Sequence, residues 1–357
     1  MLQLVSVFAF FRLRRFGGLL AVLWIGCGGA LHPEARRLAD QGIVLLGQGN
    51  LDEAEASLRL ALELDRNSAL VHARLGVLCL ERGALEEAEK WLRSSLRIDG
   101  ELLEGWVGLA ALFVRMGRWA EAQRAYERAL SLDPLHREAR IGLAWLFVRV
   151  RNFGRARAHL LRLVARDAED AEALALLSWV ELGLDRPSAA ADFLDRARLI
   201  EPSSPLVRFV QALLHARRGE YRTARALLEA LQGRPEWERE VSLRLAAIDL
   251  IEGESEAARC RIKELLEEDD SDPVLRLLAA EIARAQGRWE EARMHARVLT
   301  QAEPHLDIGW IIDAEASAEL GDRPSAQAAL RALGSESPAV QREKMRLQEL
   351  IERVAFH

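Results

Sequence analysis

Cysteine and lysine are both scarce in this sequence of 357 residues. The three cysteines, Cys27, Cys79 and Cys260, form no C-x-x-C pair, so we expect no disulfide framework. Only three of the 49 basic residues are lysines, which indicates a GC-rich coding sequence, as in many bacteria. The formal net charge of −6 provides no global basic field, so we do not expect nucleic acid as a partner.

Motifs that carry catalysis are also missing. The sequence has no H-E-x-x-H, C-x-x-C, P-loop or Rossmann glycine motif, and its eight histidines share no common spacing. Cys79 falls at an apolar position of a predicted helix, where a buried structural cysteine is the ordinary interpretation. We therefore expect no enzyme activity, no metal site and no cofactor.

No apolar run is long enough for a simple membrane anchor. The run from Phe16 to Cys27 falls short of the roughly 20 residues that a spanning helix needs. Extending it upstream would bring Arg12, Arg14 and Arg15 into the bilayer. Basic residues followed by a short apolar run and small residues are typical of a secretory signal, which we assign to residues 1–27.

The end of this run, Leu23-Trp24-Ile25-Gly26-Cys27, resembles a bacterial lipoprotein signal. In that family the cysteine after a small residue receives a lipid, so the resemblance implies attachment at Cys27. Trp24 departs from the leucine that the family prefers, and Gly28 favours the outer membrane, facing the periplasm. Two alternatives stay open, namely an ordinary signal with an incidental Cys27, and a cytoplasmic protein whose true start lies downstream. Residues 28–34 would form a short linker.

The clearest structural unit is residues 103–136, where the sequence predicts two amphipathic helices. Gly117 separates them and Pro134 ends the second. Apolar residues recur at helical spacing on each side of the turn; they are Trp106, Leu109, Ala110 and Phe113, then Trp119, Ala122, Tyr126, Ala129 and Leu130. The unit is therefore predicted to be a helical hairpin.

Equal steps of 34 residues, the length of this unit, divide 35–340 into nine such units without an insertion. They are 35–68, 69–102, 103–136, 137–170, 171–204, 205–238, 239–272, 273–306 and 307–340. We number positions within each unit from its first residue. Position 8 is always small, and position 20 is always alanine, as expected where two helices cross closely. Position 15, the turn, is glycine except at Arg151 and Asp185.

This pattern and its period resemble those of the tetratricopeptide repeat (TPR) family. The resemblance implies an all-α, right-handed superhelical solenoid whose first helices line a concave groove. Residues 341–357 would add an amphipathic helix that caps the open end, with Leu347, Leu350, Ile351 and Val354 along one edge. The sequence LQGRPEWERE, between units 6 and 7, is the expected place for a bend or for loosened packing.

By analogy with TPR proteins, positions 2, 5, 9 and 12 face the groove, and position 13 lies beside it. The candidate binding residues there are Val107, Val114, Arg115, Ile141, Trp145, Arg149, Trp179, Phe209, Leu213 and Arg217. They predict a protein partner with an apolar or amphipathic segment and carboxylates for the arginines. The alternative is that packing between repeats covers these residues and the arginines remain in solvent. In units 8 and 9 the same face turns acidic, at Glu281 and Glu315.

We therefore expect a non-enzymatic scaffold for protein interactions. It would be exported, attached to the membrane through its lipid, and would assist the assembly of a bacterial envelope complex for pili, secretion or motility. Two other functions are compatible with the sequence. One is a carrier or sensor that holds a lipid or acyl chain in an apolar groove, and the other is a soluble cytoplasmic adaptor.

Overall fold

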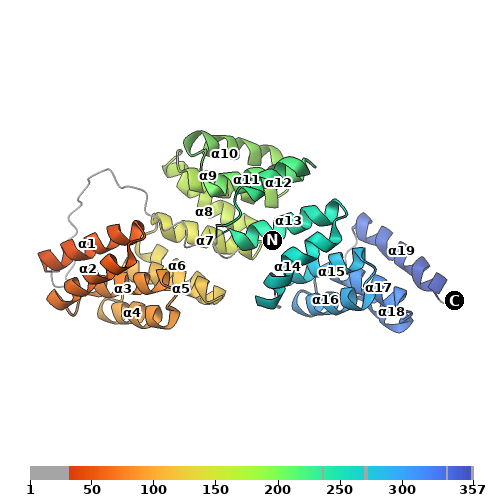
Figure 1. Ribbon diagram of the computed structural model, residues 1–357, viewed down its shortest axis with the longest axis horizontal. Helices are drawn as coiled ribbons and strands as arrows, with labels where there is room; N and C mark the ends of the chain where they lie inside the picture. Colours follow the sequence, from red (N-terminus) through yellow and green to blue (C-terminus); the bar gives the residue numbers. More distant parts are fainter. Residues whose placement is uncertain (1–31, 235–236, 269–271, 335–336, 355–357) are drawn as a thin grey trace. The chain divides into compact units, whose positions relative to one another are not determined.

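The computed structural model describes residues 32–234, 237–268, 272–334 and 337–354. These residues form 19 α-helices and, within those ranges, no strand (Figure 1). The predicted all-α solenoid of helical hairpins is confirmed.

The helices of the first six hairpins follow one another in pairs. They are α1 Pro33–Gly47, α2 Leu51–Leu64, α3 Ala69–Glu81, α4 Leu85–Ile98, α5 Leu103–Arg115, α6 Trp119–Leu132, α7 Arg137–Arg149, α8 Phe153–Arg166, α9 Ala171–Gly183, α10 Pro187–Ile200, α11 Pro205–Arg217 and α12 Tyr221–Glu229. From α3 to α11 every first helix begins at position 1 and every second helix begins at position 17.

The last three hairpins and the final helix keep this pattern with small changes. They are α13 Glu238–Ile251, α14 Ser255–Glu268, α15 Pro273–Ala285, α16 Trp289–Ala302, α17 Asp307–Glu319, α18 Arg323–Ala332 and α19 Pro338–Val354. The main departure is α12, which has nine residues where α10 and α14 each have 14.

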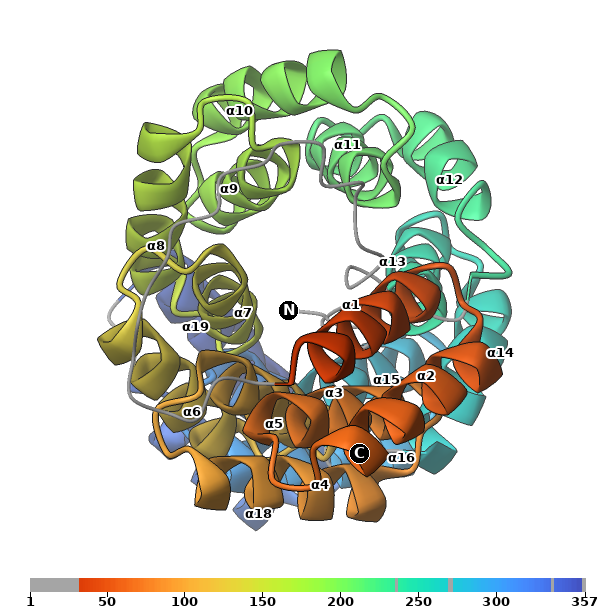
Figure 2. The ribbon, with the colours of Figure 1, turned by 90° about the vertical axis from the view of Figure 1, so that its left-hand side faces the viewer.

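The chain divides into two compact units, which we describe separately. Unit 1 holds residues up to Leu214 together with Arg234 and Trp237, and unit 2 holds His215–Gly233 and the residues from Glu238 onward. In unit 1, α3, α5, α7 and α9 lie on the concave side, whereas α4, α6, α8 and α10 lie on the convex side (Figure 2). First helices therefore line the inner side of unit 1.

The turn inside each hairpin needs a left-handed residue. Seven turn glycines adopt φ values between 68° and 85°. The two units without glycine use the same conformation, with φ of 56° at Arg151 and 60° at Asp185. A side chain in this region is strained, so the repeat geometry imposes the turn even where the residue opposes it.

Close helix crossing explains the small residues. All nine alanines at position 20 are 0% exposed: Ala54, Ala88, Ala122, Ala156, Ala190, Ala224, Ala258, Ala292 and Ala326. At position 8, a Cβ added to Gly76 would lie 2.6 Å from Cγ of Leu92 on the other helix of the hairpin. A larger residue at these positions would push the two helices apart.

Ion pairs join position 21 of one repeat to the next repeat. In the early repeats the acid is at position 21: Glu55 pairs with Arg82, and Glu89 with Arg118 at 3.3 Å. In later repeats the signs are reversed, in the pairs Arg157–Glu181 at 2.5 Å, Arg225–Asp249 at 2.6 Å and Arg293–Asp322 at 3.3 Å.

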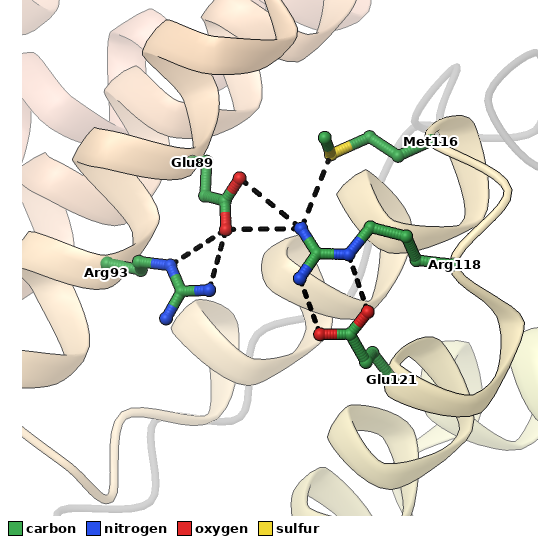
Figure 3. Close-up of polar contacts among 5 residues, drawn as sticks. All are labelled: Glu89, Arg93, Met116, Arg118 and Glu121. Atoms are coloured by element: carbon green, nitrogen blue, oxygen red, sulfur yellow. Dashed lines mark hydrogen bonds and ion pairs between the residues drawn. The ribbon is translucent and has the colours of Figure 1, made fainter.

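Figure 3 shows one of these junctions, between the second and third repeats. Nε of Arg93 donates to Glu89 Oε1 at 2.8 Å on the same helix, and Arg118 reaches Glu89 from the next repeat. Arg118 also pairs with Glu121, and its Nη1 lies 3.9 Å from Sδ of Met116. The hydrogen bond from Arg93 is the main cause of the lowered pKa of Glu89.

Helix α19 packs on the last hairpin of unit 2. Leu347 and Ile351 are buried in one apolar cluster with Ala329, Leu330 and Leu333, and Leu350 lies at its edge. Arg346 adds an ion pair to Glu315 of α17 at 3.0 Å. The amphipathic edge of α19 therefore covers the face of α17 and α18 that no further repeat covers.

Candidate functional site

The concave side of unit 1 carries most of the residues predicted to bind a partner. Val107 and Val114 on α5 and Ile141 on α7 are buried. Leu213 on α11 is half-buried and therefore more accessible than these three. Side chains as buried as the first three present little surface to another molecule.

The predicted aromatic residues form one buried row. Trp145 and Trp179 are 3% and 4% exposed, with ring centroids 5.6 Å apart and planes at 87°. Trp179 and Phe209 follow at 4.9 Å, and Phe209 and Trp237 at 5.1 Å. These separations suit favourable aromatic contacts. The aromatic row, Trp145–Trp179–Phe209–Trp237, therefore links α7, α9 and α11 of unit 1, and a role in binding a partner remains a prediction.

Sequence reasoning missed the last member of this row. Trp237 lies in the stretch LQGRPEWERE, which was expected to be loosely packed, yet it is among the largest fully buried side chains described. The sequence did contain a signal for this burial, because Trp237 is a large aromatic residue in an otherwise mostly polar stretch between units 6 and 7. The division between the two units passes through this same stretch.

The arginines at position 13 do not form a uniform row. Arg115 and Arg217 are exposed, whereas Arg149 is half-buried with its guanidinium 4.1 Å from the ring centroid of Trp119. Stacking of this kind occupies one face of the guanidinium. Arg115 and Arg217 are thus the predicted site residues that the structure leaves exposed.

A carboxylate that sequence reasoning overlooked lies near Arg115. Glu81 occupies the same position 13 on the preceding first helix, α3. Burial raises the pKa of Glu81, and the charge of Arg115 partly opposes that rise. Comparing position 13 between neighbouring units would have revealed this acid–base neighbour.

The acidic face predicted in unit 2 is largely neutralised. Arg284 pairs with Glu281 at 2.6 Å and with Glu315 at 3.3 Å. Arg346 reaches Glu315 as well. These arginines come from α15 and α19, so the face consists of ion pairs instead of open carboxylates.

Isolated titratable groups in the described residues are kept neutral by burial. Burial lowers the pKa of His159 and of His295, and it raises the pKa of Cys79 to about 11. The described ranges contain no group of three or more His, Cys, Asp or Glu side chains placed to hold a metal ion. The absence of catalysis and of cofactors stays a prediction.

The membrane predictions concern the beginning of the chain. Cys27 and the whole of 1–27 lie outside the described residues, so lipid attachment remains untested. Among the helices that the structure does describe, none has the length and hydrophobicity to cross a bilayer.

The repeat pattern and the stacked hairpins have the architecture of a tetratricopeptide repeat array. Residues 39–101 and 113–180 each match a family model described as tetratricopeptide repeat, so the chain carries TPR repeats as predicted. No curated protein matches the sequence.

Solved structures share the fold at low identity. The structure of the APC/C hetero-tetramer Cut9-Hcn1 is 14% identical with a TM-score of 0.64, covering 92% of this chain and 77% of that one. A monomeric mutant of IFIT1 with m7Gppp-AAAA is 19% identical with a TM-score of 0.52, covering 79% and 72%. PilW, a type IV pilus biogenesis factor, is 17% identical with a TM-score of 0.50, covering 60% and 99%. Such varied relatives show the fold and do not specify the function.

Proposed function

We propose that the chain is a non-enzymatic scaffold that binds a protein partner on the concave side of its repeats. The observation that carries this proposal is how the repeats use their residues. The residue common to all nine units, alanine at position 20, is fully buried. The exposed side chains at position 13 differ from unit to unit, as in Arg115, Arg217 and Glu319. A stack of this kind offers a graded surface suited to recognition of a long segment.

The partner segment should be amphipathic and partly acidic. In unit 1, Arg115 is an exposed residue that can bind a carboxylate, and Leu213 offers partly exposed apolar surface; Arg217, in unit 2, can bind a carboxylate separately. A groove that holds an acyl chain is less well supported, because the aromatic residues predicted to line it are buried against one another.

We also propose that the chain acts in the bacterial cell envelope, anchored by a lipid on Cys27, in the assembly of a pilus, secretion or motility complex. The support is the sequence Gly26-Cys27 after a short apolar run, and the brief linker 28–34, which would hold the repeats close to the membrane. PilW, a pilus biogenesis factor, has the same fold, so the fold is compatible with such a role.

Site-specific photo-crosslinking tests the binding surface. A benzophenone amino acid is introduced at position 115 or 217, and at position 199 on α10 as the control, because Leu199 is 83% exposed on a second helix. We expect one discrete crosslinked protein from 115 or 217 and none from 199. An identical crosslinking pattern from all three positions would show that the first helices have no special role.

Lipid attachment needs a separate experiment. Cells that express the full chain are grown with labelled palmitate, alongside cells that express Cys27→Ala. Label on the wild type alone supports the anchor. Absence of label from both proteins, with the chain found in the cytosol, would favour the soluble adaptor.

A further inference from the structure

The fourth repeat is the most basic part of the array. Residues 137–170 contain eight arginines and four acidic residues, in a chain whose net charge is −6. Helix α8 contributes four of the arginines and has no acidic residue at all. The excess of positive charge is therefore concentrated on one helix of unit 1.

Three arginines on the exposed surface of α8 lack a carboxylate partner among the described residues. Arg155, Arg162 and Arg166 are all exposed, and no ion pair joins any of them to a described carboxylate. Arg166 donates from Nη1 to the backbone oxygen of Leu135 at 3.0 Å, which leaves its charge uncompensated. By contrast Arg157 on the same helix pairs with Glu181.

Positive charge extends beneath this surface. Arg140 on α7 is only 5% exposed, and within the described structure it makes no ion pair; its Nη2 donates to the backbone oxygen of Pro134. Burial and then the charge of Arg162 lower the pKa of Arg140. Burial, followed by the charges of Arg140 and Arg162, lowers the pKa of His159 between them. These cations repel one another, and an added anion would relieve that repulsion.

The shape of α8 indicates what kind of anion fits. The other exposed residues of α8 are small, namely Gly154, Ala158 and Ala165, and they lie beside the line of arginines. Small side chains let a second helix approach closely, and Arg155, Arg162 and Arg166 have the spacing i, i+7, i+11 along one side of a helix.

The neighbouring second helices on the convex side, α6 and α10, carry both signs of charge (Figure 2). Their exposed charged residues are Arg124, Glu127 and Arg128 on α6, and Asp192, Asp195, Arg196 and Arg198 on α10. The largest excess of positive charge therefore lies on α8, a surface one helix wide, roughly 10–12 Å. The exposed residues of α8 include no large apolar side chain that could enter a bilayer.

We infer that the exposed face of α8, formed by Arg155, Arg162 and Arg166 with the small residues beside them, is a docking surface for an acidic helix of a protein partner. This inference rests on the proposed function, since it supposes that the scaffold has a protein partner. It adds a second surface, on the convex side, with a defined partner chemistry.

The test uses the full chain and a designed probe. The probe is a fluorescein-labelled, alanine-rich peptide, long enough for several helical turns, with glutamates at i, i+7 and i+11. A peptide of equal composition has its glutamates spread around the helix. Fluorescence anisotropy measures Kd for both peptides with the wild type and with Arg155→Glu/Arg162→Glu/Arg166→Glu. The matched control is Arg323→Glu/Arg331→Glu/Arg342→Glu, which changes the net charge equally at three exposed arginines of unit 2.

We expect the patterned peptide to bind more tightly than the dispersed one. Reversal of the α8 charges should raise its Kd by about ten- to hundredfold, whereas the control should stay within about twofold. Equal losses in both variants, or equal affinity for both peptides, would overturn the inference. So would tighter binding, through the same arginines, to mixed vesicles of phosphatidylcholine and phosphatidylglycerol or to a labelled DNA duplex. Far-UV circular dichroism verifies folding, and a triple Arg→Gln variant, which should lose affinity in the same direction, replaces the reversed one if helicity falls.

Failure here is distinguishable from failure of the proposed function. Crosslinking from positions 115 and 217 does not involve α8. If those positions capture a partner while the peptide does not bind α8, the docking inference is wrong and the scaffold proposal stands.

Discussion

Replacing Trp179 with alanine tests whether the aromatic row is core or binding surface. Trp179 is 4% exposed and lies between Trp145 at 5.6 Å and Phe209 at 4.9 Å. Truncating a buried tryptophan costs about 3–5 kcal/mol, and the loss of two aromatic contacts argues against the lower end of that range. We therefore expect the free energy of unfolding of unit 1 to fall by about 4 kcal/mol.

Urea unfolding followed by circular dichroism measures this loss. With a slope of about 2 kcal/mol/M, the midpoint of the affected transition should fall by about 2 M. Leu199→Ala is the matched control, because Leu199 is 83% exposed and its loss should change stability by less than about 0.5 kcal/mol. The double variant with Phe209→Ala should show a coupling of about 0.5–1.5 kcal/mol, since the two rings are in contact.

The opposite outcome is informative. If Trp179→Ala costs less than about 1 kcal/mol and instead abolishes crosslinking to a partner, the tryptophan is not a packing residue, and the aromatic row is a binding surface after all. The original prediction of an aromatic groove would then be correct.

Three further predictions concern charge, turn geometry and pH. Asp249 is 0% exposed and binds two partly exposed arginines, so Asp249→Asn should destabilise unit 2 by about 2–3 kcal/mol in urea unfolding. A loss below about 0.5 kcal/mol would show that these ion pairs contribute little to stability. Arg151 has φ of 56°, so Arg151→Gly should stabilise unit 1 by about 1 kcal/mol, measured by the same unfolding midpoint. Destabilisation would contradict the conclusion that Arg151 is strained in this turn. Burial lowers the pKa of His295 below its usual value, so its contribution to stability is complete above about pH 6.5 and is lost as pH falls toward the folded pKa. The melting temperature of unit 2 should therefore drop between pH 7 and 5, less steeply in His295→Gln, and equal slopes would exclude this histidine as a cause.

The turns show how far sequence alone could predict this fold. Glycine at position 15 predicted a left-handed residue, and the structure confirms it at Gly117 with φ of 71°. Arg151 and Asp185 broke the sequence pattern, yet they adopt the same conformation. The period and the small residues at positions 8 and 20 were sufficient, because they specify helix crossings that leave the turn no other path.

The candidate site was less predictable, for a physical reason. The TPR resemblance predicts that position 9 faces the groove, but whether its side chain meets solvent depends on the size of its neighbours in the adjacent repeats. Trp145 and Trp179 fill that space themselves, which one hairpin considered alone does not reveal. Likewise, the partners of Glu315 come from α15 and α19, some 31 residues away on either side in sequence.

The ion pairs at position 21 make the order of the repeats matter. The small residues at positions 8 and 20 recur in every hairpin, so loss of two whole units, 103–170, would keep the helix crossing within each remaining hairpin. It would, however, place the second repeat beside the fifth, and Glu89 would then face Glu181 where each now has an arginine. At these junctions the sign of the charge at position 21 therefore decides which repeat can follow without placing two like charges together.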